Sequence, residues 1–518
     1  MALGGGSRAR RLARNSILSF VGLAVPSLIG IVTIPRIVSG LGPERFGVLA
    51  LVWMVLGYLG TFDLGMGRAV TRFVAQAVHE DDLRSIPRIV GTSFAVLVPF
   101  GMVTGALLAG LTPWITGHVL HLSGPLAYEM SGALYVLAIA LPISQLSVLL
   151  RGVLEAFQRF DLVNAVKLPA GAASFVLPLL GIWLGLGLPA IVGLLLASRV
   201  VVLLAYLTLC RRLIPWWGPS STAGPPFFRG LFAFGGWTTV STLAQQGLSY
   251  VERFVLGHLL GIVSVTYYSA PLEAISRLSI VPISLATALF PDVSRGGRTS
   301  TLGPVMARSI KYLLLALVPG AGIAIVFMVD LLTAWLGPDF VWAVRSSRIL
   351  LLCFLLSAIG YVPLTVLYGR GRPRGKAILD LLELPLFGLL AATLIPPFGL
   401  EGAATARLIV QVVDMTALFV MVHHATGVGL RDLLTEGCGR VALLCAALAV
   451  GSALLLQHKP GPHLTLLLVA GGVVAFVVLV LRTALDERDW MLMPSVRSRL
   501  ERLGLAKAVR DVGSAPIS

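Results

Sequence analysis

Residues 14–76 decide the fold of this chain: RNSILSFVGLAVPSLIGIVTIPRIVSGLGPERFGVLALVWMVLGYLGTFDLGMGRAVTRFVAQ. The first apolar run, residues 16–38, is long enough to cross the hydrocarbon core of a bilayer as one helix. Residues 40–43 then predict a turn, and a second apolar run, residues 46–64, leads back. Arginines precede the first run and follow the second, so the positive-inside rule places both ends of this hairpin in the cytoplasm.

The composition of the whole chain is that of a protein embedded in a membrane. Hydrophobic residues make up 57% of the 518 residues and charged residues only 12%, whereas soluble domains carry about 25% charged residues. The formal net charge is +16, but most of the 40 Lys and Arg residues lie in alternate loops, which is a topology signal. No basic patch is interleaved with aromatic residues, and we therefore expect no nucleic-acid partner.

Apolar runs of membrane-spanning length recur along the chain and predict an all-α polytopic membrane protein with about 14 transmembrane helices. An even number of spans places both termini in the cytoplasm. The predicted spans are residues 15–38, 46–64, 89–112, 126–150, 164–187, 188–210, 232–257, 262–291, 309–336, 346–368, 378–398, 402–424, 439–457 and 463–482.

A polar linker rich in proline and serine, residues 211–229, separates two sets of six predicted spans. The two sets resemble each other weakly, because Arg36 precedes a Leu-Gly pair that ends at Gly42 and Arg253 precedes another that ends at Gly261. We expect two six-helix lobes around a central cavity, followed by two additional helices. The expected parts are residues 1–231 for the first lobe with its linker, 232–424 for the second lobe, 425–482 for the two extra spans and 483–518 for a basic amphipathic tail in the cytoplasm.

Two segments outside the spans have the pattern of amphipathic helices. Apolar residues after the second span recur at helical spacing beside arginines, which predicts a helix lying along the membrane or, alternatively, a solvated connector. The C-terminal tail combines apolar and basic residues in a similar way, and we expect it to bind the membrane surface. The apolar positions are Ala69, Val70, Phe73, Val74 and Ala77 in the first segment, and Trp490, Leu492, Val496, Leu500, Leu503 and Leu505 in the second.

Ionisable side chains within spans are costly to insert and are therefore candidates for function. Arg199 lies near the middle of the sixth predicted span, which contains no acidic residue. Glu273 and Arg277 lie one helical turn apart in the eighth span, where they can pair. The alternative for each group is an ion pair that only fixes helix packing. The other polar candidates are Asp63 in the second span, Gln245 and the neighbouring pair Glu252 and Arg253 in the seventh span, and Arg407 and Asp414 in the twelfth span.

The sequence lacks the signatures of the common enzyme classes. No His, Cys or acidic cluster has metal-ligand spacing, the four cysteines included, and no nucleotide-binding loop or G-x-S-x-G element occurs. The predicted external loops are short, the longest being residues 112–126 and 337–345, which disfavours a catalytic site outside the membrane. We therefore expect no enzymatic activity and no bound cofactor.

Two stretches of the chain resemble a known transporter family. Residues 34–76, IPRIVSGLGPERFGVLALVWMVLGYLGTFDLGMGRAVTRFVAQ, are similar to the opening hairpin of O-antigen (Wzx-type) polysaccharide flippases of the multidrug/oligosaccharidyl-lipid/polysaccharide exporter superfamily. The similarity continues in residues 250–295, YVERFVLGHLLGIVSVTYYSAPLEAISRLSIVPISLATALFPDVSR, and in the predicted layout of fourteen spans. The Leu-Gly, Phe-Gly and Asp-Leu-Gly elements indicate the superfamily better than any single substrate.

The resemblance implies a flippase of the inner membrane that moves a polyprenyl-diphosphate-linked oligosaccharide to the outer leaflet by alternating access, for cell-surface polysaccharide assembly. It implies partners among membrane lipids and other polysaccharide assembly proteins, and coupling to a proton or sodium gradient is left open. A drug or cation antiporter or a lipid II flippase of the same superfamily, and a membrane-embedded glycan polymerase or ligase, remain alternatives. The expected substrate path contains Arg199, Arg277, Arg36, Arg253 and Gln245, and the candidates for ion coupling are Glu273, Asp63 and Asp414.

The distribution of basic residues predicts the side of the membrane on which each loop lies. Reporter fusions after Ser220 and Gly296 should read cytoplasmic, and a fusion at Gly461 should read external, because the first two follow an even number of spans and the third an odd number. Paired alkaline phosphatase and fluorescent-protein fusions measure this directly. An external reading at Ser220 would overturn the predicted topology.

Overall fold

The computed structural model of the chain describes residues 5–59, 66–214, 247, 251–285, 299–370, 373–434, 437–458 and 461–483. Within these ranges every regular element is a helix, which confirms the predicted all-α class. Most of the predicted seventh span and residues 484–518 of the predicted tail lie outside the described residues.

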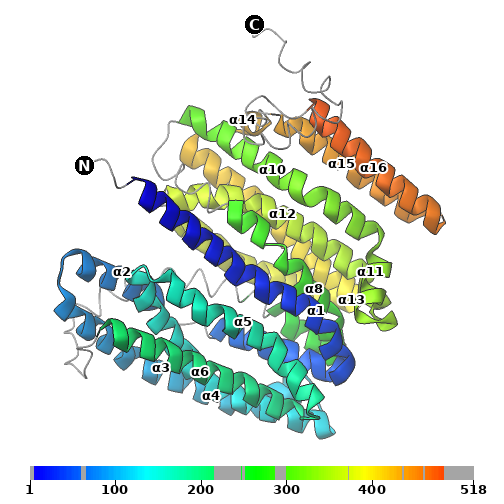
Figure 1. Cartoon of the computed structure of the whole chain (residues 1–518). Coiled ribbons are helices and arrows are strands. Elements are labelled where there is room, and N and C mark those ends of the chain that lie inside the picture. The colour runs from blue at the N-terminus through cyan, green and yellow to red at the C-terminus, as the bar shows by residue number, and fades with distance from the viewer. Residues whose placement is uncertain are drawn as a thin grey trace. The chain divides into compact units, whose positions relative to one another are not determined.

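The helices follow the order of the predicted spans (Figure 1). The first are α1 (Gly5–Leu59), α2 (Met66–His79), η1 (Leu83–Ser85), α3 (Ile86–Trp114), η2 (Ile115–Val119), α4 (Gly124–Ala156), α5 (Phe160–Trp183), α6 (Leu188–Leu213) and, after helical residues 251–260, α8 (Ile262–Arg277). The remainder are α10 (Thr299–Val326), α11 (Met328–Leu336), η3 (Pro338–Ala343), α12 (Val344–Gly369), α13 (Pro373–Thr426), α14 (Leu430–Leu433), α15 (Cys438–His458) and α16 (Pro462–Thr483).

Two elements, α1 and α13, are each a pair of helices joined at a glycine. With 55 and 54 residues they are far longer than the roughly 20 residues that cross a bilayer. Each is broken where the sequence predicts a turn: Gly42 has φ 78° and Gly399 has φ 57°, a left-handed region that glycine enters without the steric penalty of a Cβ atom. Pro43 follows the first break, at a position where a helix start tolerates its missing N–H. The break predicted at residues 40–43 is therefore confirmed, and the end of the second predicted run, residues 60–64, lies outside the described residues.

One predicted span is wrong as a continuous helix. The prediction runs over residues 262–291, but α8 ends at Arg277, the backbone turns at residues 278–279, and a helix resumes at residue 280. Pro282 explains the interruption, because it has no N–H to bond the carbonyl of Leu278 and its ring crowds that carbonyl. The predicted span 309–336 is likewise divided between α10 and α11.

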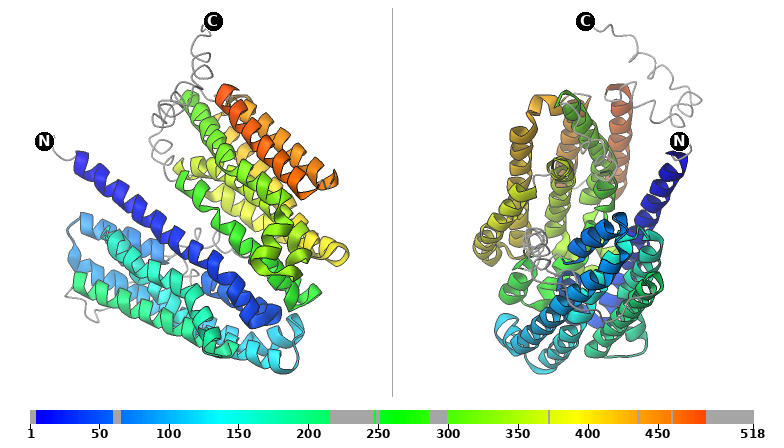
Figure 2. Two further views of the ribbon diagram at one scale, coloured as in Figure 1. Left: turned by 45° about the vertical axis from the view of Figure 1, so that its right-hand side comes forward. Right: turned by 90° about the vertical axis from the view of Figure 1, so that its left-hand side faces the viewer.

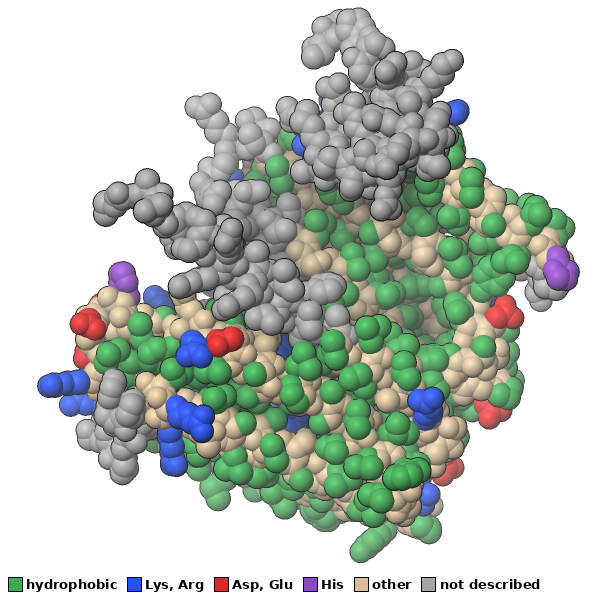
Figure 3. Space-filling model, in the orientation of Figure 1, with side chains coloured by type: hydrophobic (Ala, Val, Ile, Leu, Met, Phe, Trp, Pro, Cys, Tyr) green, Lys and Arg blue, Asp and Glu red, His purple; other side chains and the backbone are tan. Residues whose placement is uncertain are grey.

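Ten helical segments of the described chain are long and apolar enough to cross a membrane, and two of them contain the breaks at Gly42 and Gly399. Hydrophobic side chains also dominate the face of the molecule drawn in Figure 3. Large apolar side chains such as Trp183 and Leu443 are 84% and 73% exposed, which is costly in water and favourable in lipid. The chain is therefore a polytopic membrane protein, and the full number of about 14 spans stays a prediction.

The described residues form two compact units. The lobe boundaries given by the sequence remain predictions. The first unit contains most of the N-terminal half together with α8, and the second contains the C-terminal helices. Their ranges are Met1–Ile280, Trp335–Ser346 and Lys376–Ala406 for the first unit, and Val281–Ala334, Ser347–Gly375 and Arg407–Ser518 for the second.

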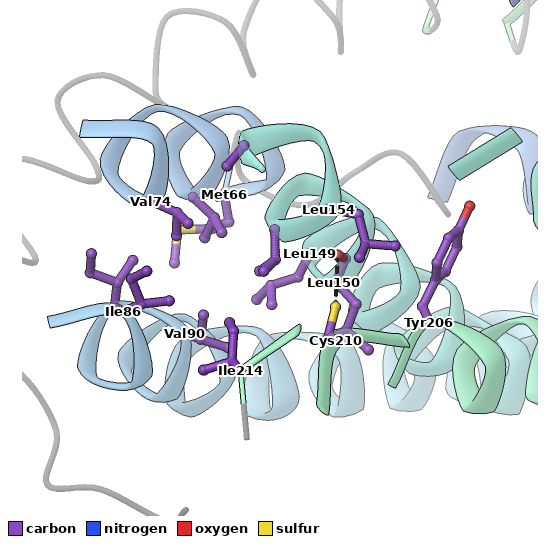
Figure 4. Close-up of a cluster of buried hydrophobic side chains, with 14 of the residues drawn as sticks. Met66, Val74, Ile86, Val90, Leu149, Leu150, Leu154, Tyr206, Cys210 and Ile214 are labelled. Atoms are coloured by element: carbon purple, nitrogen blue, oxygen red, sulfur yellow. Dashed lines mark hydrogen bonds between the residues drawn. The ribbon is translucent and has the colours of Figure 1, made fainter. Parts of the chain in front are cut away.

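In the first unit, α4 packs against α3, α2 and α6, and α5 packs against α6 and α1 (Figures 1 and 2). Figure 4 shows a core of this unit, to which α2, α3, α4 and α6 each contribute side chains. The predicted helix after the second span is confirmed as α2, but its apolar face is buried against protein rather than facing lipid or water. Ala69 and Val70 are fully buried, for example, because α4 and α3 cover them.

In the second unit, α10 packs against α15, and α15 packs against α16 (Figure 1). Its main core joins Met306 and Ile310 of α10 to Val362 of α12 and Leu418 of α13. A smaller cluster, which includes Val441 of α15 and Phe476 of α16, attaches the two C-terminal helices. The two helices predicted as extra spans are thus part of this unit.

The contact between α3 and α4 depends on glycine. A Cβ atom at Gly105 would lie 2.6 Å from the carbonyl oxygen of Ala138, and one at Gly101 would lie 2.8 Å from the Cα of Pro142. Pro142 also deprives the Ala138 carbonyl of its helical hydrogen-bond donor, so the backbone of α3 approaches a carbonyl that no helical N–H occupies. Only a residue without a side chain permits this approach.

We predict that Gly105→Ala lowers the free energy of unfolding by about 1–3 kcal/mol, because both backbones must move apart. The matched control is Gly110→Ala on the same helix, where a Cβ meets no atom within 4 Å; it should raise the stability by about 0.5–1 kcal/mol through helix propensity. Thermal unfolding of the detergent-purified proteins measures both changes. An unchanged Tm for Gly105→Ala would contradict the close contact.

Candidate functional site

Three of the predicted site residues meet in the first unit. Glu273 of α8 accepts a hydrogen bond at Oε1 from Nη2 of Arg253, on the preceding helical residues 251–260, at 3.0 Å. Its second oxygen, Oε2, accepts one from Nη2 of Arg277 at 3.2 Å. The side chains of Arg253, Glu273 and Arg277 are 8%, 20% and 26% exposed. We call these three residues the arginine–glutamate cluster.

The charges of the arginine–glutamate cluster do not balance. One carboxylate is shared by two guanidinium groups, which leaves one positive charge in excess within the cluster. The Nε atoms of Arg253 and Arg277 are buried and have no hydrogen-bond partner among the described residues. Buried N–H groups are rarely left unpaired in native proteins. The cluster therefore offers both charge and donors to an additional anion.

Phe175 of α5 supports the exposed side of this cluster. The guanidinium carbon of Arg277 lies 4.9 Å from the centroid of the Phe175 ring, within the range of a cation–π interaction. The ring itself is held by Trp53, with centroids 5.2 Å apart in an edge-on arrangement. Gly30 of α1 provides the space, since a Cβ there would lie 3.2 Å from the ring. Arg277 is thus fixed between Glu273 and an aromatic surface.

Trp53 also joins α1 to α5 through the backbone. Its indole N–H donates to the carbonyl oxygen of Ser174 at 3.2 Å. Pro178, four residues further along α5, has no N–H with which to bond this carbonyl. The tryptophan therefore supplies the donor that the helix lacks, next to Phe175.

A similar hydrogen bond occurs at Pro35 of α1. The indole N–H of Trp335 donates to the carbonyl oxygen of Ile31 at 2.8 Å, and Pro35 is the residue that leaves this carbonyl without a helical donor. Both bonds lie within the first unit. Two proline-containing helices of this unit are thus each held by a tryptophan from another element.

The adjacent residues Glu252 and Arg253 have different partners. Arg253 pairs with Glu273, whereas the carboxylate of Glu252 accepts a hydrogen bond from the hydroxyl of Tyr268. Glu252 and Tyr268 are both fully buried. A one-residue step on a helix turns the side chain by about 100°, so neighbouring residues point to different surroundings.

The remaining predicted site residues do not join the arginine–glutamate cluster. Arg199 of α6 forms no ion pair among the described residues, and its Nε is buried without a hydrogen bond. Arg36 is exposed on α1. Asp414 belongs to the second unit, where the side-chain amide of Gln411 donates to it at 3.3 Å. Asp63 and Gln245 lie outside the described residues.

A second group of buried charges, which the sequence did not predict, lies on α13. Nζ of Lys376 lies 2.6 Å from Oδ1 of Asp380 and 4.0 Å from Oε1 of Glu383. All three side chains are more than nine-tenths buried. Their spacing of four and three residues is a helical signal, but the predicted span begins at residue 378 and leaves Lys376 in a loop. Among the described residues no three His, Cys or acidic side chains gather at metal-ligand distances.

The chain matches the family model described as "Polysaccharide biosynthesis protein" over residues 12–296, which is more than half of its length. The chain belongs to this family. The region of this polysaccharide biosynthesis protein that matches the model includes Phe175, Arg199 and the whole arginine–glutamate cluster.

Relatives of this polysaccharide biosynthesis protein are named as transporters and flippases. It is 28% identical over 412 residues to a Shigella flexneri protein named as an O-antigen transporter, and the match covers 79% of this chain and 96% of the relative. It is 22% identical over 502 residues to a Haloferax volcanii protein named as the flippase AglR, with 93% and 98% of the two chains covered.

Solved structures share the fold of this polysaccharide biosynthesis protein. An inward-facing multidrug transporter of the MATE family, within the MOP superfamily, matches with a TM-score of 0.68 at 15% identity, over 79% of this chain and 98% of the other. The lipid II flippase MurJ matches with a TM-score of 0.68 at 11% identity, over 91% and 99%. These two matches show a shared fold, and the family match over residues 12–296 confirms the polysaccharide family predicted from the sequence.

The tryptophan that supports Phe175 provides a test of the site geometry. We predict that Trp53→Phe lowers the free energy of unfolding by about 1–3 kcal/mol, because an aromatic ring remains but the partly buried carbonyl of Ser174 loses its donor. Trp342→Phe is the matched control, since Trp342 is 75% exposed and should tolerate the change. Equal melting temperatures for the two variants would show that the bond to Ser174 contributes nothing.

Proposed function

We propose that this chain is a flippase that moves a polyprenyl-diphosphate-linked oligosaccharide from the cytoplasmic to the outer leaflet of the inner membrane by alternating access, for cell-surface polysaccharide assembly. Its membership of the polysaccharide biosynthesis protein family and its relatives named as an O-antigen transporter and a flippase support this function. The structural neighbours are named as a multidrug transporter and a lipid II flippase, which supports transport rather than glycan synthesis.

The observation that carries the proposal is the arginine–glutamate cluster, with its excess positive charge and unpaired guanidinium N–H groups. A diphosphate presents several anionic oxygens, and a guanidinium group binds such oxygens through parallel charge-assisted hydrogen bonds. The cluster is only partly closed, because Glu273 and Arg277 remain 20% and 26% exposed. We assign the diphosphate of the substrate to Arg253 and Arg277.

Arg199 is the second position in the proposed substrate path. A guanidinium group keeps its charge in a membrane and requires a partner or water. Since Arg199 forms no ion pair among the described residues, we assign it to an anionic part of the substrate. Arg36 and Gln245 complete the proposed path, and coupling to a proton or sodium gradient through Glu273, Asp63 or Asp414 belongs to the same proposal.

A cation or drug antiporter is the alternative within the superfamily, favoured by the fold of the MATE transporter. The two functions demand opposite charge in the path. A cationic substrate requires uncompensated carboxylates, whereas the arginine–glutamate cluster has an uncompensated guanidinium group. The cluster therefore favours the anionic lipid-linked substrate.

We predict that Arg277→Gln weakens substrate binding by about ten- to hundredfold, because it removes charge-assisted bonds worth roughly 1.5–3 kcal/mol. The variant should fold, since Arg253 still pairs with Glu273. Arg277→Lys should restore export only in part, because an ammonium group lacks the planar fork. Arg199→Gln should behave like Arg277→Gln.

Surface glycan in a strain that lacks the protein, measured together with membrane abundance, tests these variants. Arg345→Gln is the matched control, because Arg345 is 76% exposed and pairs with Glu401 outside the proposed path. Normal glycan export by well-expressed Arg199→Gln and Arg277→Gln variants would show that neither arginine serves the substrate.

A further inference from the structure

We propose that the carboxylate of Glu273 is an internal competitor for the substrate: it occupies the anion site of the empty transporter and leaves Arg277 when the diphosphate binds. The inference rests on the proposed function and adds a role for Glu273 that differs from ion coupling. The groups suited to bind a phosphate already hold an anion supplied by the chain, the carboxylate of Glu273.

The way in which Glu273 binds the two arginines suits displacement. Each guanidinium group has five N–H donors, yet each bonds Glu273 through a single Nη2 atom. Neither contact is the two-bond fork that gives arginine–carboxylate pairs their strength. An incoming diphosphate can therefore form more hydrogen bonds to Arg277 than Glu273 does.

The two contacts of Glu273 differ, and the difference identifies Arg277 as the partner that is released. Arg253 is 8% exposed and bonds Glu273 at 3.0 Å, whereas Arg277 is 26% exposed and bonds it at 3.2 Å. Substrate reaches the more exposed guanidinium group first. Glu273 then keeps its bond to Arg253, so the carboxylate remains paired while Arg277 binds phosphate.

Phe175 keeps Arg277 in position during this exchange. The cation–π contact at 4.9 Å does not involve Glu273, so it persists when the carboxylate leaves. Trp53 and the space at Gly30 fix the ring from α1. Phe175 is therefore a positioning residue, since it acts on the substrate through Arg277.

An internal competitor weakens binding and accelerates release. A transporter that binds its substrate too tightly on one side releases it slowly on the other. Removing the negative charge of Glu273 should therefore tighten the binding of anions and slow the transport cycle. A scaffold role has the opposite consequence, because loss of the carboxylate would let the two guanidinium groups repel each other and would disorder the site.

The experiment measures binding of radiolabelled inorganic pyrophosphate to the full-length, detergent-purified protein. We expect Glu273→Gln, which preserves size and removes charge, to tighten binding by about tenfold and to reduce glycan export per molecule in cells. Glu273→Asp has a shorter side chain that cannot bridge both arginines equally, and it should give an intermediate gain. Weaker or unchanged pyrophosphate binding by both variants would overturn the proposal.

Further variants separate this inference from the proposed function. Arg277→Gln must weaken pyrophosphate binding if the cluster is the anion site, and unchanged binding would remove the basis of the proposed function itself. Phe175→Leu should weaken binding, and Phe175→Tyr, which keeps the ring, should restore it. A failure of Phe175→Tyr to restore binding would contradict the positioning role.

Discussion

The ion pairs that Glu273 makes with Arg253 and Arg277 allow three charged side chains to lie together with little exposure, and the rest of the structure near them depends on this pairing. Without the shared carboxylate, two like charges would meet in a medium that screens them poorly. A single carboxylate pairs with both guanidinium groups, and the cluster keeps one excess positive charge for a substrate. α8, which carries Glu273 and Arg277, packs against α1, and Phe175 of α5 contacts Arg277.

Much of the fold follows from the sequence, because long apolar runs and their punctuation reflect the same constraint that the membrane imposes on the backbone. The break at Gly42 lies within the predicted turn, and α6 begins at the predicted residue, Leu188. Proline effects were harder to predict. The end of α8 before Pro282 depends on a single missing N–H, and the carbonyl freed by Pro178 is satisfied by Trp53, far away in the sequence.

The candidate site was predictable only where its contacts lie within one helix. Glu273 and Arg277 are one helical turn apart, so their pairing follows from local geometry. The pairing of Arg253 with Glu273 crosses from one helix to the next, and the contact of Arg277 with Phe175 crosses to α5, so tertiary packing alone decides both. A phenylalanine within an apolar span also gives no signal that sets it apart from other packing residues.

Transport of the lipid-linked glycan by the purified chain tests the central claim most directly. Proteoliposomes that contain a polyprenyl-diphosphate-linked oligosaccharide can be treated with a membrane-impermeant glycosidase, which cleaves only the outer-leaflet fraction. We expect vesicles with the protein to expose nearly all of the substrate to the glycosidase over time, and Arg277→Gln vesicles to do so much more slowly. Cleavage that stops at the outer-leaflet fraction, as in vesicles without protein, would contradict this expectation.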